Sequence, residues 1–491
     1  MKHSSRIAAL LAVISLASVA QGGTPTFRYE AIPEFGFPMS RANDVLPNGH
    51  INVVGEVNAG QVWRPVVWSR NADWTFVELP VPSAEGDAFA FGVEQIPAGG
   101  LFVVGEVWVD ARFPFPYLWK EENPGNFMMV ELPNAGEGGA NGIAVGTELV
   151  VIAGWSEPGG EPAARKDHRD ASVWIGRFTE PLIREPLPAY GGERPSIAYD
   201  ASFFGEMPVA VGQATNDGDF LVPILWTCDK GEWLLRELPL LPGGLRGVAH
   251  GVSRPNGQHK IVGSCEDATG LTLPVRWVSD DGFDWEIQQF EPLGIIGDVH
   301  DVASSDGLDY HVGRSLNDDS IGTLWITNGV FEVFDLNEVI MDGPPPMMLQ
   351  TAHGVAANGH IYIVGEGTVS GAASRGQGTE THAYLLEEDV VTSVPSAPST
   401  IMPSVDARPN PAGQQLSFGI SLPIGGEVTL TVHDPNGRLV ATLVDEPLSA
   451  GEHLASWNAR EVPGQAVATG VYFARLRVGG NIVSSRFVIR R

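Results

Sequence analysis

The stretch that decides the fold is residues 51–80, INVVGEVNAGQVWRPVVWSRNADWTFVELP. It contains three short apolar segments, which end near Gly55, at Trp68 and at Pro80. Short segments rich in Val, Phe and Trp, separated by Gly, Asn and Asp, are typical of β-strands joined by turns. The stretch therefore predicts three consecutive antiparallel strands.

The same pattern recurs along most of the chain. The glycine of the first segment recurs at Gly55, Gly105, Gly154, Gly212, Gly263, Gly313 and Gly365, with spacings of 50, 49, 58, 51, 50 and 52 residues. The second segment ends at Trp68, Trp119, Trp174, Trp226, Trp277 and Trp325, and Tyr384 takes this place in the last unit. A fourth short element precedes each glycine. Four strands in about 50 residues indicate a propeller blade, whereas a solenoid would need polar capping repeats.

The seventh unit lacks its own last strand. It stops near Leu386, but residues 27–33 (FRYEAIP) align with residues 76–80 (FVELP) of the first unit. The N-terminal strand can therefore complete the last sheet and hide two strand edges. We predict an all-β chain with a seven-bladed β-propeller over residues 24–388, closed by its N-terminal strand.

The N-terminus has the features of an export signal. Lys2 and Arg6 precede an apolar run from Ile7 to Ala20, and residues 18–20 give the small-x-small pattern of a cleavage site. We therefore expect a signal peptide over residues 1–20 and a secreted or cell-surface protein. A membrane anchor is the alternative, although the run is short for a bilayer. No transmembrane segment is expected after the signal is removed.

A different module follows the propeller. Residues 389–403 are rich in Val, Ser and Pro, as linkers are. Residues 404–491 contain short alternating strands with turns between them, such as the turn at residues 434–437. This spacing predicts a small Ig-like β-sandwich.

The repeats resemble the extracellular HAF-type repeat family through the His382-Ala383-Tyr384 step, over roughly residues 40–388. Most units carry Pro-Val or Pro-Tyr in place of that His and aromatic residue. This resemblance implies a secreted β-repeat protein and no particular reaction.

The C-terminal module resembles the Ig-like domain of the flagellar hook-capping protein and the related sorting domain of type IX secretion substrates. The residues that carry this resemblance are Pro409-Asn410-Pro411, Val432-His433-Asp434, Gly437-Arg438, Gly451, Trp457, Gly470-Val471-Tyr472 and Arg490-Arg491. It implies export of a bacterial protein by secretion machinery, followed by surface attachment or release. An ordinary accessory sandwich is the alternative, because a fold alone does not fix a function.

The composition of the chain argues against some classes of partner and of structure. The chain has a formal charge of −29, which argues against nucleic-acid binding because such binding neutralises phosphate. With 43% hydrophobic and 18% charged residues, a largely disordered chain is not expected. Cys228 follows the Trp strand of the fourth unit, and Cys265 follows the Gly strand of the fifth. These antiparallel strands should end on opposite faces of the propeller, so we expect no disulfide.

Two sets of residues at equivalent repeat positions are candidate ligands. His250, His300 and His353 recur in units five to seven, and three imidazoles near the axis of the ring suit a divalent metal. The alternative is that each histidine hydrogen-bonds the neighbouring blade. Asp44, Asp200 and Asp301 recur one position later, where a turn or strand-end role competes with calcium binding.

The loops after the Gly strands vary most, and the loop of the third unit carries Arg165, Lys166, His168 and Arg169. Loops on a rigid scaffold commonly bind ligands, although insertion drift would also produce this variation. No hydrolase motif or phosphate loop is present, and we predict no catalytic residues and no cofactor, with calcium or another divalent metal as the alternative.

These features predict an exported, non-enzymatic binding or cell-surface protein with an extracellular glycan or protein ligand. A secreted polysaccharide hydrolase or lyase and a structural surface component are the alternatives.

Overall fold

The computed structural model divides the chain between residues 390 and 391 into two compact units. It describes residues 25–388 and 404–490 apart from gaps at 84, 110–112, 135, 158–168, 193, 254–257, 306, 318, 328–330, 342, 370–379, 409–415, 423–425, 434–438, 450, 460–466 and 479–480. The predicted signal peptide and the predicted linker lie outside the described residues. Within them, no helix is long and apolar enough to cross a bilayer.

The described part of the first unit forms seven four-stranded antiparallel sheets. The first three sheets contain β2 (Ser40–Pro47), β3 (Ile51–Asn58), β4 (Trp63–Arg70), β5 (Trp74–Glu78); β6 (Ala88–Gln95), β7 (Leu101–Val109), β8 (Phe113–Asn123), β9 (Asn126–Glu131); and β10 (Gly138–Val145), β11 (Leu149–Ser156), β12 (Asp170–Arg177), β13 (Ile183–Pro186). The next three contain β14 (Ser196–Phe204), β15 (Met207–Thr215), β16 (Leu221–Asp229), β17 (Glu232–Glu237); β18 (Gly247–Val252), β19 (His259–Glu266), β20 (Thr272–Ser279), β21 (Glu286–Gln289); and β22 (Ile296–Ser305), β23 (Leu308–Leu316), β24 (Ser320–Thr327), β25 (Phe331–Asp335). The last contains β26 (Met348–Ala357), β27 (Ile361–Val369), β28 (Glu380–Glu388) and β1 (Phe27–Ala31).

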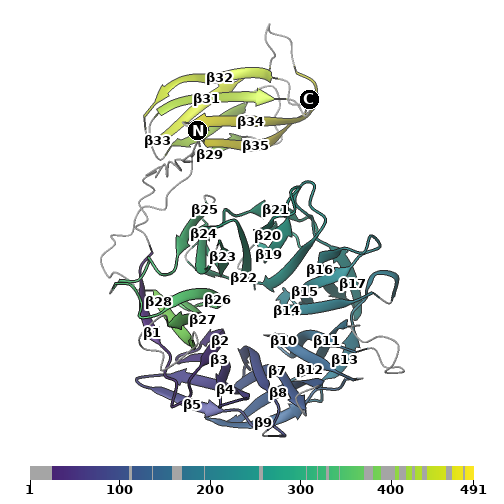
Figure 1. The fold of residues 1–491 in the computed structure, drawn as a ribbon. Helices are drawn as coiled ribbons and strands as arrows, with labels where there is room; N and C mark the ends of the chain where they lie inside the picture. Colours follow the sequence, from purple (N-terminus) through teal and green to yellow (C-terminus); the bar gives the residue numbers. More distant parts are fainter. Residues whose placement is uncertain are drawn as a thin grey trace, which may run out of the picture. The chain divides into compact units, whose positions relative to one another are not determined.

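The seven sheets are arranged in a ring, with the first strand of each sheet innermost (Figure 1). Each of these first strands contacts the first strands of both neighbouring sheets, and β26 contacts β2. The ring is therefore closed, which excludes a solenoid and confirms the predicted β-propeller.

The N-terminal strand closes the ring as predicted. β1 pairs with β28 over the whole of its length, from Phe27 opposite Glu388 to Ala31 opposite Tyr384. Phe27 is fully buried in the cluster that joins the sixth and seventh sheets. Its amide also donates to the carbonyl of Val339, so β1 is attached both to β28 and to the connection between β25 and β26.

The glycine that defines the repeat is required by a β-bulge. In the first sheet the pairing of β2 with β3 shifts between Ala42 and Asp44, which leaves Asn43 as the extra residue. A Cβ atom on Gly55, opposite this bulge, would lie 2.0 Å from the carbonyl oxygen of Arg41. The same shift occurs in the first strand pair of every sheet.

The tryptophans and the prolines of the repeat hold neighbouring sheets together. The Trp119 side chain is fully buried, and its indole N–H donates to the carbonyl of Pro80 at the end of the preceding sheet, at 2.8 Å. Trp68 donates in the same way to the carbonyl of Pro33, which follows β1. The first and seventh sheets are therefore joined by the same kind of hydrogen bond as the other neighbouring sheets. Trp174, Trp226 and Trp277 donate to Pro133, Pro188 and Pro239, and Trp325 donates to Glu291.

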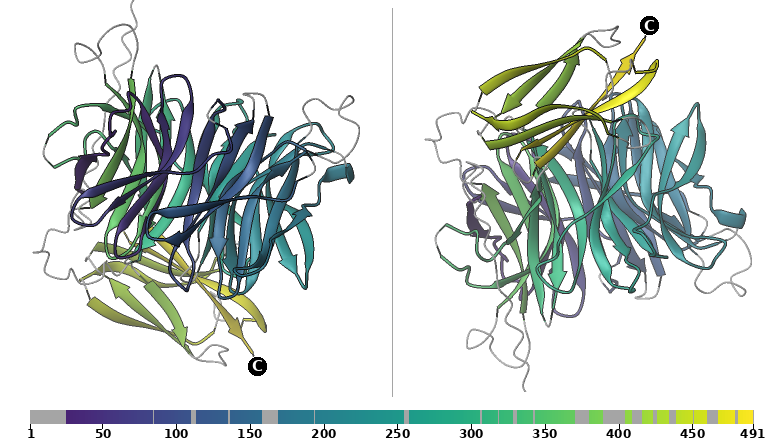
Figure 2. Two further views of the ribbon diagram at one scale, coloured as in Figure 1. Left: turned by 90° about the horizontal axis from the view of Figure 1, so that it is seen from below. Right: turned by 90° about the horizontal axis from the view of Figure 1, so that it is seen from above.

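Each sheet spans the ring from one face to the other (Figure 2). We call the side with the turns between the first and second strands the turn face; these turns include residues 96–100, 146–148 and 205–206. The opposite side carries the connections from second to third strands and from one sheet to the next, and we call it the loop face.

The second unit is a two-sheet β-structure with a core of its own. One sheet has the order β29 (Ser404–Arg408), β30 (Leu416–Leu422), β33 (Gly451–Trp457), and the other has the order β32 (Leu439–Leu448), β31 (Gly426–His433), β34 (Gly470–Val478), β35 (Asn481–Ile489). The core contains Phe418, Trp457, Tyr472 and Phe487. The rings of Phe418 and Phe487 meet edge to face at 5.3 Å. This arrangement agrees with the predicted Ig-like sandwich.

Candidate functional site

The seven bulge residues form what we call the inner ring: Asn43, Phe91, Asn141, Tyr199, His250, His300 and His353. Each is half-buried, whereas the residue before it, such as Ala42, is fully buried. A bulge re-aims a side chain away from the regular alternation of its strand. The sequence predicts these positions, and the structure brings them together on the innermost strands (Figure 1).

Three inner-ring side chains hydrogen-bond the next sheet. Asn43 donates to the carbonyl of Ala90 at 2.8 Å, and Asn141 donates to that of Ala198 at 2.8 Å. The His300 Nδ1 lies 3.0 Å from the carbonyl oxygen of Ala352, which requires the proton on that nitrogen. Asn43, Asn141 and His300 thus make the same hydrogen bond to a carbonyl of the next sheet. For His300 this supports the alternative that the histidine hydrogen-bonds the neighbouring blade.

The three predicted histidines lie side by side. The ring centroids of His250 and His300 are 5.7 Å apart, and those of His300 and His353 are 5.6 Å apart with an interplanar angle of 9°. Burial lowers the pKa of His250 and His300, the latter to about 3, where the neighbouring imidazoles also disfavour the charged form. Across the described part of the chain, no group of three or more His, Cys, Asp or Glu residues is placed to hold a metal ion.

The three aspartates connect sheets through their carboxylates. Asp301 accepts the amide of Val302 at 2.7 Å with one oxygen and that of Val355, in the next sheet, at 2.8 Å with the other. Asp44 and Asp200 accept the amides of Val93 and Val252 in the same way. We call these three residues the aspartate clips. Each of the two oxygens of a clip accepts one backbone amide.

Burial is the main influence on the pKa of the aspartate clips. It raises the pKa of Asp200 to about 7, and it raises those of Asp44 and Asp301. The charge of Asp301 adds to the effect on Asp44 and Asp200, and so does the charge of Glu94. The backbone donors act in the opposite direction. The link between sheets was not predicted, although glycine occupies the same position in the unit that follows each clip.

A charged group near the loop face was not predicted. Arg41 Nε lies 2.9 Å from Glu366, and His353 Nε2 lies 3.7 Å from the same carboxylate. Burial opposes ionisation of Glu366, but His353 and Arg41 hold its pKa below the ordinary value. Burial raises the pKa of Glu56 to about 8, although Arg41 and Asn43 act against this. The sequence feature that could have indicated this charged group is the Glu that follows the repeat glycine in three units, at Glu56, Glu106 and Glu366.

The candidate ligand loop is described only at its end. Arg165, Lys166 and His168 lie outside the described residues. The guanidinium of Arg169 lies over the ring of Trp155, with its carbon 4.4 Å from the centroid. Cys228 lies near the end of β16 and Cys265 near the end of β19, and both are free thiols, as predicted.

Exposed apolar side chains gather on the loop face of the fourth to sixth sheets. Leu221, Leu245, Leu271, Leu293 and Ile295 are between 37% and 58% exposed, and we call them the apolar rim. The segments that carry Leu221, Leu245 and Leu271 are adjacent. The guanidinium carbon of Arg246 lies 5.6 Å from the ring centroid of Phe220, and a Cβ atom on Gly243 would lie 2.7 Å from Ala268.

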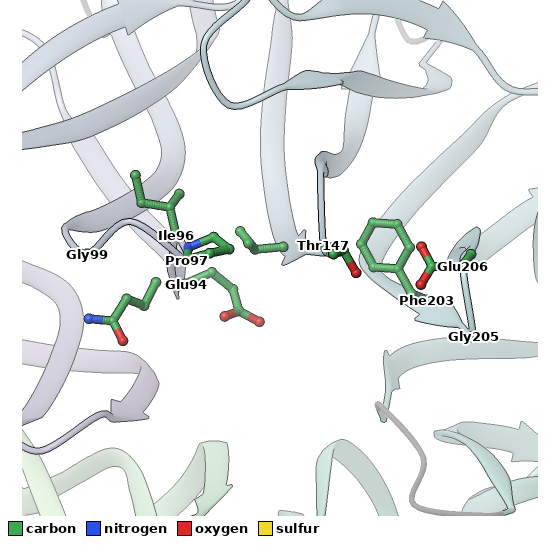
Figure 3. A pocket seen from close by; sticks show the side chains of 11 residues that line it. Glu94, Ile96, Pro97, Gly99, Thr147, Phe203, Gly205 and Glu206 are labelled. Carbon is green, nitrogen blue, oxygen red and sulfur yellow. The ribbon is translucent and has the colours of Figure 1, made fainter.

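A pocket of about 620 Å³ opens on the turn face, between the second, third and fourth sheets. It is lined by Glu94, Gln95, Ile96, Pro97, Gly99, Val145, Gly146, Thr147, Phe203, Gly205 and Glu206. Figure 3 shows Glu94 on one side of this pocket, Phe203 and Glu206 on the other, and Thr147 between them. The pocket therefore lies on the face opposite the loops that were predicted to bind a ligand.

Comparison with known proteins matches the second unit to a family. Residues 410–478 match the FlgD Ig-like domain. A search of curated proteins found no match.

Solved structures resemble the fold at low identity. A sialidase from Trypanosoma rangeli is 9% identical with a TM-score of 0.42, over 84% of this chain and 85% of that one. TolB from Acinetobacter baumannii is 12% identical with a TM-score of 0.36, over 62% and 64%. PorZ, a surface component of the type-IX secretion system of Porphyromonas gingivalis, is 11% identical with a TM-score of 0.23, over 92% and 81%.

Proposed function

We propose that this chain is an exported, non-enzymatic interaction protein of the cell surface. Its propeller binds an extracellular partner through the loop face, and its C-terminal domain directs secretion or attachment. The observation that carries this proposal is the apolar rim. Exposed apolar side chains that gather on one face mark interaction sites, because proteins in water otherwise keep such surface small.

The apolar rim is presented on ordered backbone. Asp267 accepts the amides of Thr269 at 2.7 Å and of Leu271 at 3.0 Å, which fixes the turn that exposes Leu271. The amide of Leu293 donates to the Ser315 hydroxyl, and that of Ile295 donates to the carbonyl of Leu316. A surface that is already ordered loses less conformational entropy on binding. The exposure of these side chains is therefore suited to recognition of a protein partner.

The hydrogen bonds made by His300 and by the aspartate clips also favour a binding protein over an enzyme. Catalytic acids and bases need room to exchange protons with a substrate. Here the aspartate clips accept backbone amides, and His300 donates to the next sheet. These groups support the scaffold, which leaves recognition to the loops and turns.

Export is proposed from the sequence and from the C-terminal domain. The basic and apolar start of the chain has the pattern of a signal peptide. The match to the FlgD Ig-like domain supports a module that acts outside the cytoplasm. Detection of the chain by surface proteolysis of intact cells, and its loss when residues 404–491 are deleted, would support this role. Retention of the full chain in the cytoplasm would contradict it.

The binding role is tested with a rim variant. Leu245→Ser, Leu271→Ser and Ile295→Ser combined should reduce binding of the purified protein to the producing cell surface by about tenfold or more, because each serine removes buried apolar contact. Ile183→Ser with Leu234→Ser is the matched control, since both residues are exposed on outer strands. Equal loss in both variants, or turnover of a polysaccharide by the wild type, would contradict the proposal.

A second candidate, hydrolysis of polysaccharide, is favoured by the Glu56 and Glu366 carboxylates. Both are close to Arg41, at 3.9 Å and 2.9 Å, and their pKa values are shifted in opposite directions. Such a pair is the combination that acid–base cleavage of a glycosidic bond uses. Product release from a polysaccharide panel that disappears in Glu366→Gln would establish this alternative.

A further inference from the structure

We propose that the pocket on the turn face binds an ammonium or guanidinium group carried on an apolar stem, as in the side chains of Lys and Arg. This site lies on the face opposite the apolar rim, so the inference does not depend on the proposed function. It rests on the shape of the pocket, the charge of its walls and the apolar surface beside that charge.

The size of the pocket suits an organic group. Its volume of about 620 Å³ lies within the range of small-molecule sites. Its two carboxylates come from separate sheets, Glu94 from β6 and Glu206 from the turn after β14, and they lie on opposite sides (Figure 3). A bare metal ion requires ligands that converge on one point, whereas a cationic side chain can contact one wall and extend along another.

The walls of the pocket are negative. Two of the lining residues are glutamates, and the lining contains no Lys, Arg or His. The charge of Glu94 also acts on two aspartate clips, because it contributes to the raised pKa of both Asp44 and Asp200. Opposite charges a few ångströms apart stabilise each other, so a lining that contains two glutamates favours a cationic group over a neutral one.

Apolar surface lies beside the charge. The Phe203 ring packs on the backbone of Gly146, where a Cβ atom would lie 3.0 Å from the ring. Phe203 is held there from the fourth sheet, and Ile96 and Pro97 line the second-sheet side. Long basic side chains bury their methylene groups on such surface while their charged ends contact polar groups. The pocket thus has carboxylates for the charged end of an amphipathic cation and apolar surface for its methylene groups.

The test is calorimetric titration of the full chain with Nα-acetyl-lysine methylamide and its arginine analogue. Nα-acetyl-norleucine methylamide is the neutral probe. We expect both cationic probes to bind, the neutral probe to bind at least tenfold more weakly, and binding to weaken with added salt. Glu94→Gln with Glu206→Gln should weaken the lysine probe by about tenfold or more.

Matched variants separate charge in the pocket from charge elsewhere. Glu232→Gln with Glu332→Gln removes two exposed carboxylates from outer strands and should leave the affinity unchanged. Thr147→Lys should abolish binding with both pocket glutamates intact, because it supplies a cation to the pocket from the chain itself. Melting temperatures of all variants confirm that they are folded.

A peptide probe identifies the source of the cation, and three results would contradict the proposal. A ten-residue lysine-containing peptide that binds at least tenfold more tightly than the capped residue identifies a polypeptide as the source of the cation, and equal affinity identifies a small amine. Binding that is unchanged in the Glu94→Gln and Glu206→Gln variant would overturn the proposal. So would equal binding of the neutral probe, or no binding of either cationic probe or the peptide to the wild type.

Discussion

The aspartate clips each hold two sheets with one carboxylate. When such a buried acceptor is removed, the amides that it bound are left without a partner away from water, and the cost is larger than that of one exposed hydrogen bond. The clips occur at three of the seven junctions, in the first, fourth and sixth sheets.

Replacement of a clip should lower stability. Asp301→Ala removes the acceptor of the Val302 and Val355 amides, and we expect a loss of about 1–3 kcal/mol in the free energy of unfolding. Asp217→Ala is the control, because that side chain is 85% exposed. Denaturant titration measures both. Equal stabilities for the two variants would mean that the clip contributes little.

Glu56 should make stability fall as pH rises. Its pKa is about 8 in the folded chain against an ordinary value of 4.5, so the folded state holds an extra proton between these values. Stability from this group is fully present below the lower value and is lost as pH rises through the higher one, at up to about 1.4 kcal/mol per pH unit.

The comparison that isolates this effect is Glu56→Gln, which keeps the size of the side chain and cannot ionise. The unfolding free energy of the wild type relative to this variant should fall between pH 6 and 8 and become constant above about pH 9. The histidines do not affect the comparison, because both proteins carry them. A difference that is independent of pH would show that Glu56 is ionised in the folded protein at neutral pH.

Residue-scale predictions from sequence were correct for positions and incomplete for contacts. The shared repeat position of His250, His300 and His353 placed them at one level on neighbouring blades, but it could not give the distances of 5.7 Å and 5.6 Å between their rings. It also did not predict that His353 stacks on His300 while His250 meets His300 edge to face, because the orientation of an imidazole depends on the bulge and on its contacts with the next sheet. The pocket was not predictable, because its lining comes from turns about 50 residues apart that share no motif.

At the scale of elements, β1 is the strand on which the ring depends. It hydrogen-bonds β28 along its length, and Pro33 beyond it accepts the indole N–H of Trp68. Deletion of residues 24–33 removes both attachments and exposes two edges, so we expect a large fall in the melting temperature. An unchanged melting temperature would contradict the closing role of this strand.

A point substitution tests the same strand without shortening the chain. Phe27→Ala should cost about 3–5 kcal/mol, because it leaves a cavity among the residues that join the sixth and seventh sheets. Phe113→Ala is the matched control, since that ring is 48% exposed at the start of β8. Chemical denaturation of the two variants measures the difference.

The elements were more predictable than the contacts between them. The alignment of FRYEAIP with FVELP located β1 correctly because Ile32 and Leu79 are both buried and both precede the proline that the next tryptophan contacts. The bulge could not be predicted from the sequence, because it depends on the pairing between two strands rather than on either strand alone.

At the scale of the molecule, the two units have separate cores. The second unit has its own sheets, and all of its described buried apolar residues pack with one another. We therefore expect a chain ending at residue 390 to keep the melting temperature of the propeller within about 2 °C of its value in the full protein. Calorimetry measures this, and a larger fall would show that the propeller needs the second unit to be stable.

Closure by β1 also constrains the order in which this protein can be completed. A chain synthesised or threaded through a pore from its N-terminus releases Phe27 first and Glu388, its partner in the ladder, last. Until then the seventh sheet cannot form, and the unpaired edges of the incomplete ring remain open to pairing with other chains. The entropy of bringing such distant segments together makes closure a late step. The incomplete ring is therefore the stage at which this chain is most exposed to pairing with other chains.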